Sequence, residues 1–308
     1  MTTIVTAPSF GGPEVLTLEE TDLQAPGPQQ VAIKVRAIGV NPADCKHRAG
    51  RFGGSVPVRL GSEAAGVVTA VGEGVTDVSV GDEVIAYRAP GAYATDLVVP
   101  RRAVVPKPVS LAWVDAAALL LAGVTAVHAL EATHVGADDT VLIHGAAGGV
   151  GQMAVQLARL RGARVIGTAG PSGAAIVSDL GGEATPYGDG LAERVTALAP
   201  QGVTVALDLI GTDEALAASL AVVDDRERIA SIVPRAAAMD AGIQVLGGGA
   251  GADPGTQIRE AARVELTRLA AEGAIRVKVV RTFRLADVAE AHRFLERGHA
   301  DGKVVLLP

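Results

Sequence analysis

A glycine-rich segment in the middle of the chain has the spacing best suited to chemistry. Residues 144–151 read His-Gly-Ala-Ala-Gly-Gly-Val-Gly, follow the apolar stretch Thr-Val-Leu-Ile and precede a stretch of helical composition. Glycines at such a junction allow a tight turn, close approach of the backbone to a pyrophosphate, and close packing of helix on strand. The amino end of the helix also offers unpaired N–H groups and a positive dipole to phosphates. We therefore predict a dinucleotide site, rather than an ordinary turn, formed by Gly145, Ala147, Gly148, Gly149, Val150 and Gly151.

The residues after the next predicted strand indicate which dinucleotide binds. Sequences that bind NAD carry an Asp or Glu about 20 residues further on, which holds the ribose 2′-hydroxyl. Here residues 167–173 read Gly-Thr-Ala-Gly-Pro-Ser-Gly, and no acidic residue precedes Asp179. Because a carboxylate would repel the extra phosphate of NADP, its absence favours NADPH, while the lack of Arg or Lys in this segment leaves NADH open. We include Ser172 among the cofactor-binding residues.

The elements that must position this segment alternate between strand and helix from residue 111 onward. Such alternation predicts a parallel, doubly wound sheet and hence an α/β fold. The predicted strands are residues 140–144, 164–168, 203–209 and 228–233, and the predicted helices are 116–132 and 149–161. The last sixty residues predict a helix (257–272), a strand (276–283), a helix (286–297) and a strand (303–307).

The first hundred residues have a different pattern. Residues 31–38 alternate between apolar and polar side chains, which is typical of a strand with one buried face, and turn sequences lie on both sides. Similar strands are predicted at residues 64–71, 83–87 and 94–99. We expect a small, irregular β-barrel here.

Composition excludes several classes of function. The 308 residues carry a net charge of −7 and only 3% aromatic side chains, which opposes binding to nucleic acid or to an anionic membrane. The single cysteine, Cys45, excludes a disulfide framework and Cys-rich zinc sites. No targeting segment is visible, and the apolar run 116–130 is shorter than the about 20 residues of a membrane helix. We therefore predict a cytoplasmic protein of two domains.

With these motifs in place, the chain resembles the zinc-independent quinone oxidoreductases of the medium-chain dehydrogenase/reductase superfamily, to which zeta-crystallin is related. The resemblance runs through the whole chain in order. It is carried by residues 11–16, 37–44, 61–66, 71–75, 80–84, 138–142, 146–151 and 298–306, with Gln156 and Arg159.

The resemblance implies a GroES-like, β-rich catalytic domain with a Rossmann domain inserted into it. We place the catalytic domain at residues 1–119 and 253–308 and the Rossmann domain at 120–252. Zinc-dependent relatives bind the metal through Cys and through the His of Gly-His-Glu, whereas this chain has Ser62 before Glu63 and no cysteine in residues 41–44. The ligand count therefore excludes zinc. Relatives commonly dimerise through the edges of their Rossmann sheets, so we expect a homodimer in which residues 244–247 form the edge strand.

The resemblance also implies cofactor contacts, with one departure. By analogy, Thr125 reaches the nicotinamide, and Tyr187 corresponds to a tyrosine of the NADPH-specific members. Those members carry a lysine near the position of Ala174, which is missing here. Lys303 or Arg297 from the C-terminal segment is the candidate replacement.

Hydride transfer without a metal requires positioning and a place for developing negative charge. Asn41 is the first candidate for donating a hydrogen bond to the charged oxygen, although an Asn before Pro42 can simply hold a turn. Lys46 can stabilise an enolate or be a solvated surface lysine, and Asp44 is expected to order the loop. The remaining pocket candidates are Phe52, Ser62 and Tyr93.

Bacterial relatives often have tyrosines at the positions of Lys46 and Phe52, so the resemblance does not determine whether the substrate is the usual quinone. The predicted function is metal-free, NADPH-dependent reduction of a quinone or an α,β-unsaturated carbonyl compound. The alternative is a nucleotide-binding redox sensor or crystallin-like protein without turnover.

Overall fold

The computed structural model describes residues 1–298 and 300–308, in two compact units. His299, which belongs to the last motif of the resemblance, lies outside the described residues. Unit 1 comprises Met1–Leu121 and Leu266–Pro308, and unit 2 comprises Ala122–Glu265.

The second boundary of unit 2 differs from the one predicted after residue 252. Asp253 donates its N–H to the Val245 carbonyl at 2.8 Å and accepts the Gly247 N–H at 2.7 Å. Because the carboxylate of Asp253 also contacts His128, the residues directly after position 252 pack with unit 2.

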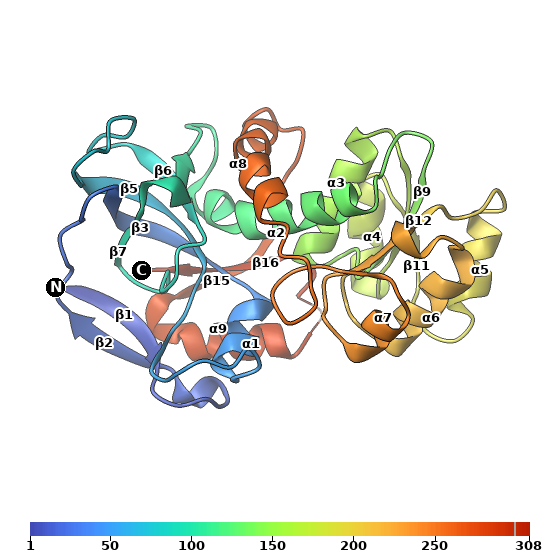
Figure 1. The fold of residues 1–308 in the computed structure, drawn as a ribbon, viewed down its shortest axis with the longest axis horizontal. Coiled ribbons are helices and arrows are strands. Elements are labelled where there is room, and N and C mark those ends of the chain that lie inside the picture. Colours follow the sequence, from blue (N-terminus) through green and yellow to red (C-terminus); the bar gives the residue numbers. More distant parts are fainter. Residues whose placement is uncertain (299) are drawn as a thin grey trace. The chain divides into compact units, whose positions relative to one another are not determined.

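Unit 1 is built from two sheets (Figure 1). The larger sheet has the order β15-β16-β3-β5-β6-β8, with β7 also paired to β3, and the smaller one has the order β2-β1-β4. The strands are β1 (Thr2–Ala7), β2 (Thr17–Thr21), β3 (Gln30–Val40), β4 (Val58–Arg59), β5 (Glu63–Val71), β6 (Glu83–Tyr87), β7 (Asp96–Pro100), β8 (Val104–Pro106), β15 (Val279–Arg284) and β16 (Lys303–Leu307). The helices are α1 (Pro42–Arg48), α9 (Val288–Glu296) and the short turns Pro13–Val15, Arg101–Ala103 and Leu285–Asp287.

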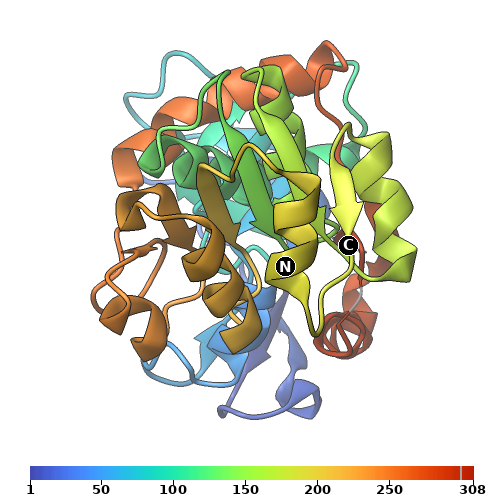
Figure 2. The ribbon, with the colours of Figure 1, turned by 90° about the vertical axis from the view of Figure 1, so that its right-hand side faces the viewer.

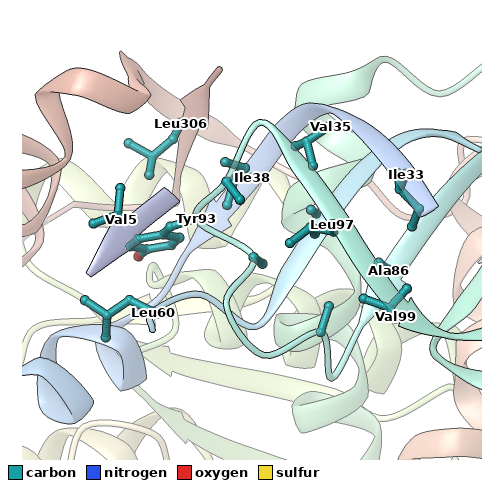
Figure 3. Packing of buried hydrophobic residues seen from close by; sticks show 14 of the residues in the cluster. Val5, Ile33, Val35, Ile38, Leu60, Ala86, Tyr93, Leu97, Val99 and Leu306 are labelled. Atoms are coloured by element: carbon teal, nitrogen blue, oxygen red, sulfur yellow. The ribbon is translucent and has the colours of Figure 1, made fainter. Parts of the chain in front are cut away.

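The core of unit 1 explains why β3 alternates in sequence. The inward-facing Val31, Ile33 and Val35 are nearly inaccessible, whereas Lys34 and Arg36 are exposed. Figure 3 shows side chains of this core, among them Val5 of β1, Ile33, Val35 and Ile38 of β3, Leu306 of the C-terminal strand β16, and Tyr93. Strand β16 pairs antiparallel with β3 and parallel with β15, so the last strand of the chain lies inside the larger sheet.

Unit 2 contains the predicted doubly wound sheet, with helices on both of its faces (Figure 2). Its order is β11-β10-β9-β12-β13-β14, and every pairing between these strands is parallel. The strands are β9 (Thr140–His144), β10 (Arg164–Thr168), β11 (Glu183–Thr185), β12 (Val205–Asp208), β13 (Ile229–Ser231) and β14 (Gln244–Val245). The helices are α3 (Gly149–Leu160), α4 (Pro171–Asp179), α5 (Leu191–Leu198), α6 (Asp213–Val222), α7 (Ala236–Asp240) and the turn Arg226–Arg228.

The predicted α/β class is confirmed, and the differences from the predicted elements are local. Strand β13 is three residues long instead of six. Residue 228 is the last of a short 3-10 turn that the Asp225 carboxylate caps, and beyond the strand the Val233 N–H donates to the Ser231 hydroxyl at 3.2 Å. Strand β14 stands at the end of the sheet order, where the sequence predicts an edge strand.

Two helices contribute residues to both units, namely α2 (Trp113–Ala132) and α8 (Thr256–Ala271). Helix α2 is long and apolar enough to cross a membrane by composition alone. However, 72% of its most apolar window is buried inside the structure, as expected of a helix at the centre of a folded core.

Candidate functional site

The turn between β3 and α1 places Asn41 at the start of a short helix. Asn41 has an extended backbone, and its N–H donates to Asp44 Oδ2 at 2.8 Å. In return, the Asp44 N–H donates to the Asn41 carbonyl at 2.9 Å. Pro42 occupies the first helical position, where its missing N–H costs nothing. The local sequence Asn-Pro-Ala-Asp therefore fixes the backbone that carries the Asn41 amide.

Buried charges hold both ends of the Asn41 side chain. Lys303 Nζ donates to Asn41 Oδ1, while Asn41 Nδ2 donates to Glu63 Oε1 at 3.0 Å. Lys303 also forms an ion pair with Glu63 at 2.9 Å, and the Leu121 N–H donates to the other Glu63 oxygen at 2.8 Å. Since an ammonium only donates and a carboxylate only accepts, the orientation of the Asn41 amide is unambiguous.

The sequence offers Lys303 as a substitute cation for the cofactor phosphate. In the structure its ammonium lies in unit 1, only 5% of the residue is exposed, and Asn41 and Glu63 bind it. Tyr93, predicted as a pocket residue, is fully buried in unit 1.

A second buried chain of polar groups reaches Asp44 from α9. Tyr93 Oη donates to Asp44 Oδ2 at 3.1 Å, and His292 Nε2 lies 3.0 Å from Tyr93 Oη. His292 Nδ1 lies 2.9 Å from Arg48 Nη1, and Arg48 Nη2 forms an ion pair with Glu296 at 2.5 Å. We call Arg48, His292, Tyr93 and Asp44 the Asp44 chain.

Burial sets the protonation of the Asp44 chain. It raises the pKa of Asp44 to about 6, although hydrogen bonds from Asn41 and Tyr93 act in the opposite direction. Burial, reinforced by the Arg48 charge, lowers the pKa of His292 to about 3, so this imidazole is neutral. Burial and the neighbouring Asp44 carboxylate raise the pKa of Tyr93 well above its usual value.

The remaining candidates on α1 and beside it are more accessible. Lys46 is half-buried, and burial, together with the nearby charge of Arg51, lowers the pKa of Lys46. Phe52 is 50% exposed, with its ring centroid 6.4 Å from that of His47. Ser62 is partly buried directly before β5.

Cys45 is expected to be an inert thiol. It is 6% exposed, and burial, together with the charge of Glu296, raises the pKa of Cys45 to about 12, so the reactive thiolate is scarce at neutral pH. We expect a thiol reagent such as 5,5′-dithiobis(2-nitrobenzoate) at pH 8 to label the native protein at least about 100-fold more slowly than the urea-unfolded chain. Equal labelling rates in the two states would contradict this assignment.

In unit 2 the glycine turn packs the start of α3 tightly against β9. Gly145 has φ +71°, a conformation that favours glycine, and its N–H donates to Thr168 Oγ1 at 3.2 Å. A Cβ at Gly151 would lie 2.2 Å from the Gly145 carbonyl oxygen and 2.7 Å from Ala146 backbone atoms. No side chain fits at position 151.

The space around Gly148, by contrast, is large enough for a Cβ atom. Gly148 is the N-cap of α3, with φ −72°, and a Cβ there would meet only the Gly145 carbonyl oxygen at 3.4 Å. No side chain caps this helix, and the N–H groups of its first turn, including Gly149 and Val150, have no partner within the helix. Ala147 is buried just before them. A bare, uncapped helix end approached by glycine is the kind of backbone geometry that binds phosphate groups.

Two of the predicted residues lie near the amino end of α4, beyond the end of β10. Gly170 is the N-cap of α4, Ser172 is the second residue of that helix, and a Cβ at Gly170 would lie 3.3 Å from Tyr187 Oη. Arg194 holds the loop that carries Tyr187, since its guanidinium donates to the carbonyls of residues 186, 188 and 189 at 3.0, 2.9 and 2.5 Å. The predicted Ser172 and Tyr187 are thus brought to one helix terminus.

Thr125, the predicted nicotinamide contact, lies on α2 beside a charged cluster of unit 2. Arg259 donates to Thr125 Oγ1 at 3.4 Å and to His128 Nδ1 at 3.2–3.3 Å, while His128 Nε2 lies 3.0 Å from Asp253 Oδ2. Sequence reasoning assigns no role to Arg259 or His128, because the two residues lie 131 positions apart.

Within the part of the chain that the structure describes, no group of three or more His, Cys, Asp or Glu side chains is placed to hold a metal ion. By the resemblance, Ser62 stands where zinc-dependent relatives have the His of Gly-His-Glu, and residues 41–44 contain no cysteine.

Comparison with known proteins supplies the family. A family described as “Alcohol dehydrogenase GroES-like domain” matches residues 27–109, and one described as “Zinc-binding dehydrogenase” matches residues 183–306. The quinone oxidoreductase of Pseudomonas aeruginosa is 34% identical over 319 aligned residues, which cover 97% of this chain and 98% of that protein. The chain belongs to the quinone oxidoreductase family of the medium-chain dehydrogenase/reductase superfamily.

Other similar proteins indicate which type of reaction the family carries out. The structure of Escherichia coli quinone oxidoreductase in complex with NADPH matches with a TM-score of 0.89 and 29% identity, covering 99% of this chain and 100% of that one. A 2-haloacrylate reductase of a Burkholderia species is 46% identical over 166 residues, which cover 51% of this chain and 50% of that protein. These matches confirm the predicted family and its combination of a GroES-like and a Rossmann-type domain, and they support an oxidoreductase enzyme.

Proposed function

We propose that the protein is a metal-free, NADPH-dependent reductase of quinones or α,β-unsaturated carbonyl compounds. The observation that carries the proposal is the turn at residues 145–151, where Gly148 has room around its Cα and Gly151 packs directly on the backbone of Gly145 and Ala146. The structural match to an NADPH-bound quinone oxidoreductase supports the same cofactor here.

The chain's own residues would bind the cofactor at three places. The uncapped amino end of α3 would bind the pyrophosphate. Ser172 in the first turn of α4, together with Tyr187 beside the N-cap of that helix, would hold the ribose phosphate. Thr125 would contact the nicotinamide. Bound NADPH would supply a hydride to the β-carbon of an enone or to a quinone, and a proton from water would balance the reduction, giving the saturated carbonyl or hydroquinone and NADP⁺.

Asn41 would act on the oxygen that gains charge. One of its two amide N–H groups is bound by Glu63, and its carbonyl oxygen by Lys303, which leaves the second N–H as the donor for a substrate oxygen. The two hydrogen bonds hold the Asn41 amide in one orientation, so the donor is preorganised.

One observation favours a charged acceptor over a neutral quinone. Lys46 is half-buried, has no carboxylate partner among residues 1–298 and 300–308, and lies near Arg51, whose charge is also unpaired there. An acceptor that carries a carboxylate would relieve this repulsion. The name of the 2-haloacrylate reductase indicates such an acceptor for that relative.

The test is oxidation of NADPH and NADH at 340 nm with chelator-treated, dialysed enzyme. 1,4-Benzoquinone, 9,10-phenanthrenequinone, a 2-alkenal and 2-chloroacrylate are supplied separately. We expect turnover with NADPH after metal removal, and a preference for 2-chloroacrylate if Lys46 and Arg51 bind the carboxylate. Loss of turnover on chelation, restored by Zn²⁺, would overturn the metal-free mechanism. Turnover with NADH alone would overturn the cofactor assignment.

Measurable NADPH binding without turnover of any acceptor would favour the alternative, a sensor or crystallin-like protein. We further propose a cytoplasmic homodimer joined along β14, the last strand in the sheet order of unit 2.

A further inference from the structure

The Asp44 chain has a fixed direction because its first member can only donate. Arg48 Nη1 carries protons and no acceptor, so His292 Nδ1 must accept at 2.9 Å. A neutral imidazole then has its proton on Nε2, which donates to Tyr93 Oη at 3.0 Å. The Tyr93 proton is in turn committed to Asp44 Oδ2 at 3.1 Å.

The Asp44 chain of hydrogen bonds ends at the backbone N–H of Asn41. The Asp44 oxygen that accepts from Tyr93 also accepts the Asn41 N–H at 2.8 Å. Arg48, Tyr93 and His292 are all at most 2% exposed, and their rings and charges come from a helix, a loop and a distant helix of unit 1. The arrangement fixes Asn41 from the backbone side, while Glu63 and Lys303 fix its amide.

We propose that His292 and Tyr93 are positioning residues for Asn41, acting through the Asp44 carboxylate. This inference rests on the proposed function, since Asn41 matters to the reaction only if it stabilises the charge developing on the substrate. Neither residue touches a reacting group in unit 1. Their contribution is to keep Asp44 ionised and directed at the Asn41 N–H.

The proposal predicts a particular pH dependence. Asp44 holds Asn41 only as a carboxylate, so kcat/KM should fall as the pH drops through the Asp44 pKa of about 6. Tyr93 donates to the ionised form and thereby lowers that pKa, so removing its hydroxyl should raise the pKa. The groups that also face or lie near Asp44 are Cys45 and Arg48 on α1, Glu63 on β5, Lys303 on β16, and His292 and Glu296 on α9.

The experiment compares the pH profile of kcat/KM for wild type, Tyr93→Phe and His292→Leu. We expect Tyr93→Phe to move the acid limb upward by about one pH unit and to lower the plateau about 3- to 10-fold. His292→Leu removes the donor to Tyr93 and should move the limb in the same direction by less, whereas His292→Gln, which retains an amide donor, should restore most of the wild-type profile. Thr6→Val is the matched control, because it removes another buried hydroxyl of unit 1 that donates to a carboxylate, that of Glu19.

A second readout does not depend on turnover. The ¹³C-carboxyl resonance of Asp44 should titrate about one pH unit higher in Tyr93→Phe than in wild type or Thr6→Val, without NADPH. An unchanged acid limb and an unchanged titration in Tyr93→Phe, with an active wild type, would overturn this inference alone. A wild type that turns over no acceptor would overturn the proposed function, and this inference with it.

Discussion

Replacing Lys303 with methionine is expected to lower the free energy of unfolding by about 3–5 kcal/mol, the usual cost of leaving one buried charge of a pair without its partner. Glu63 is fully buried, and Lys303 is its only cationic partner within 4.0 Å among the described residues. With the ammonium removed, the carboxylate retains, among the described residues, the N–H groups of Asn41 and Leu121. Urea unfolding followed by the fluorescence of Trp113, the single tryptophan and part of unit 1, measures the loss.

Two further variants distinguish charge from packing. In Glu63→Gln/Lys303→Met the new side chain is neutral. Its oxygen can accept the Leu121 N–H and its NH2 can donate to the Asn41 oxygen once the Asn41 amide turns over, so most of the loss should be recovered. Lys34→Met is the matched control, because Lys34 pairs with Asp96 at 3.1 Å but half of its side chain is exposed, and it should cost at most about 1 kcal/mol. A double variant as unstable as Lys303→Met would show that the ion pair is not the cause.

Two alanine substitutions in one turn are expected to separate cofactor binding from folding. In Gly151→Ala the Cβ would meet backbone atoms at 2.2 and 2.7 Å, which cannot move away as a side chain can. We expect a loss of about 1–3 kcal/mol of stability and a strong loss of NADPH affinity. In Gly148→Ala the nearest atom is 3.4 Å away and φ is ordinary, so the fold should change by no more than about 1 kcal/mol.

Gly148→Ala should nevertheless raise the Kd for NADPH by about 10- to 100-fold, since a methyl group would stand where the proposed pyrophosphate approaches the backbone. Calorimetric titration with NADPH measures this, with Gly136→Ala as the control, because a Cβ there meets only a side-chain oxygen at 4.0 Å. An unchanged Kd in Gly148→Ala would refute the proposed binding mode.

Much of unit 2 could be predicted because its sheet is parallel. Strands buried on both faces are continuous apolar runs, and the predicted limits of β9 and β10 coincide with those observed. The glycine turn between β9 and α3 has a local signature for the same reason. It is a single segment whose geometry its own residues determine.

The Asp44 chain could not be predicted in the same way. The Asn-Pro-Ala-Asp turn is a recognisable cap, but Arg48 and His292 are 244 positions apart and meet only when α9 packs on α1 within unit 1. The sequence of α9 did indicate that His292 is buried, because it stands among Val288, Ala291 and Leu295 on one side of the helix. A histidine in such a stripe needs a polar partner, yet the sequence does not name one.

The position of β16 has a consequence for how the protein is made. Strand β16 lies between β15 and β3, and it brings Lys303 to Glu63. Unit 2 is one continuous stretch, whereas unit 1 needs residues from both parts of the chain. On the ribosome, unit 2 can therefore complete its fold before β16 has been synthesised. At that stage β3 lacks its pairing with β16, and Glu63 lacks its ion pair with Lys303. We expect nascent chains released before residue 303 to be recognised by chaperones through an unfinished unit 1.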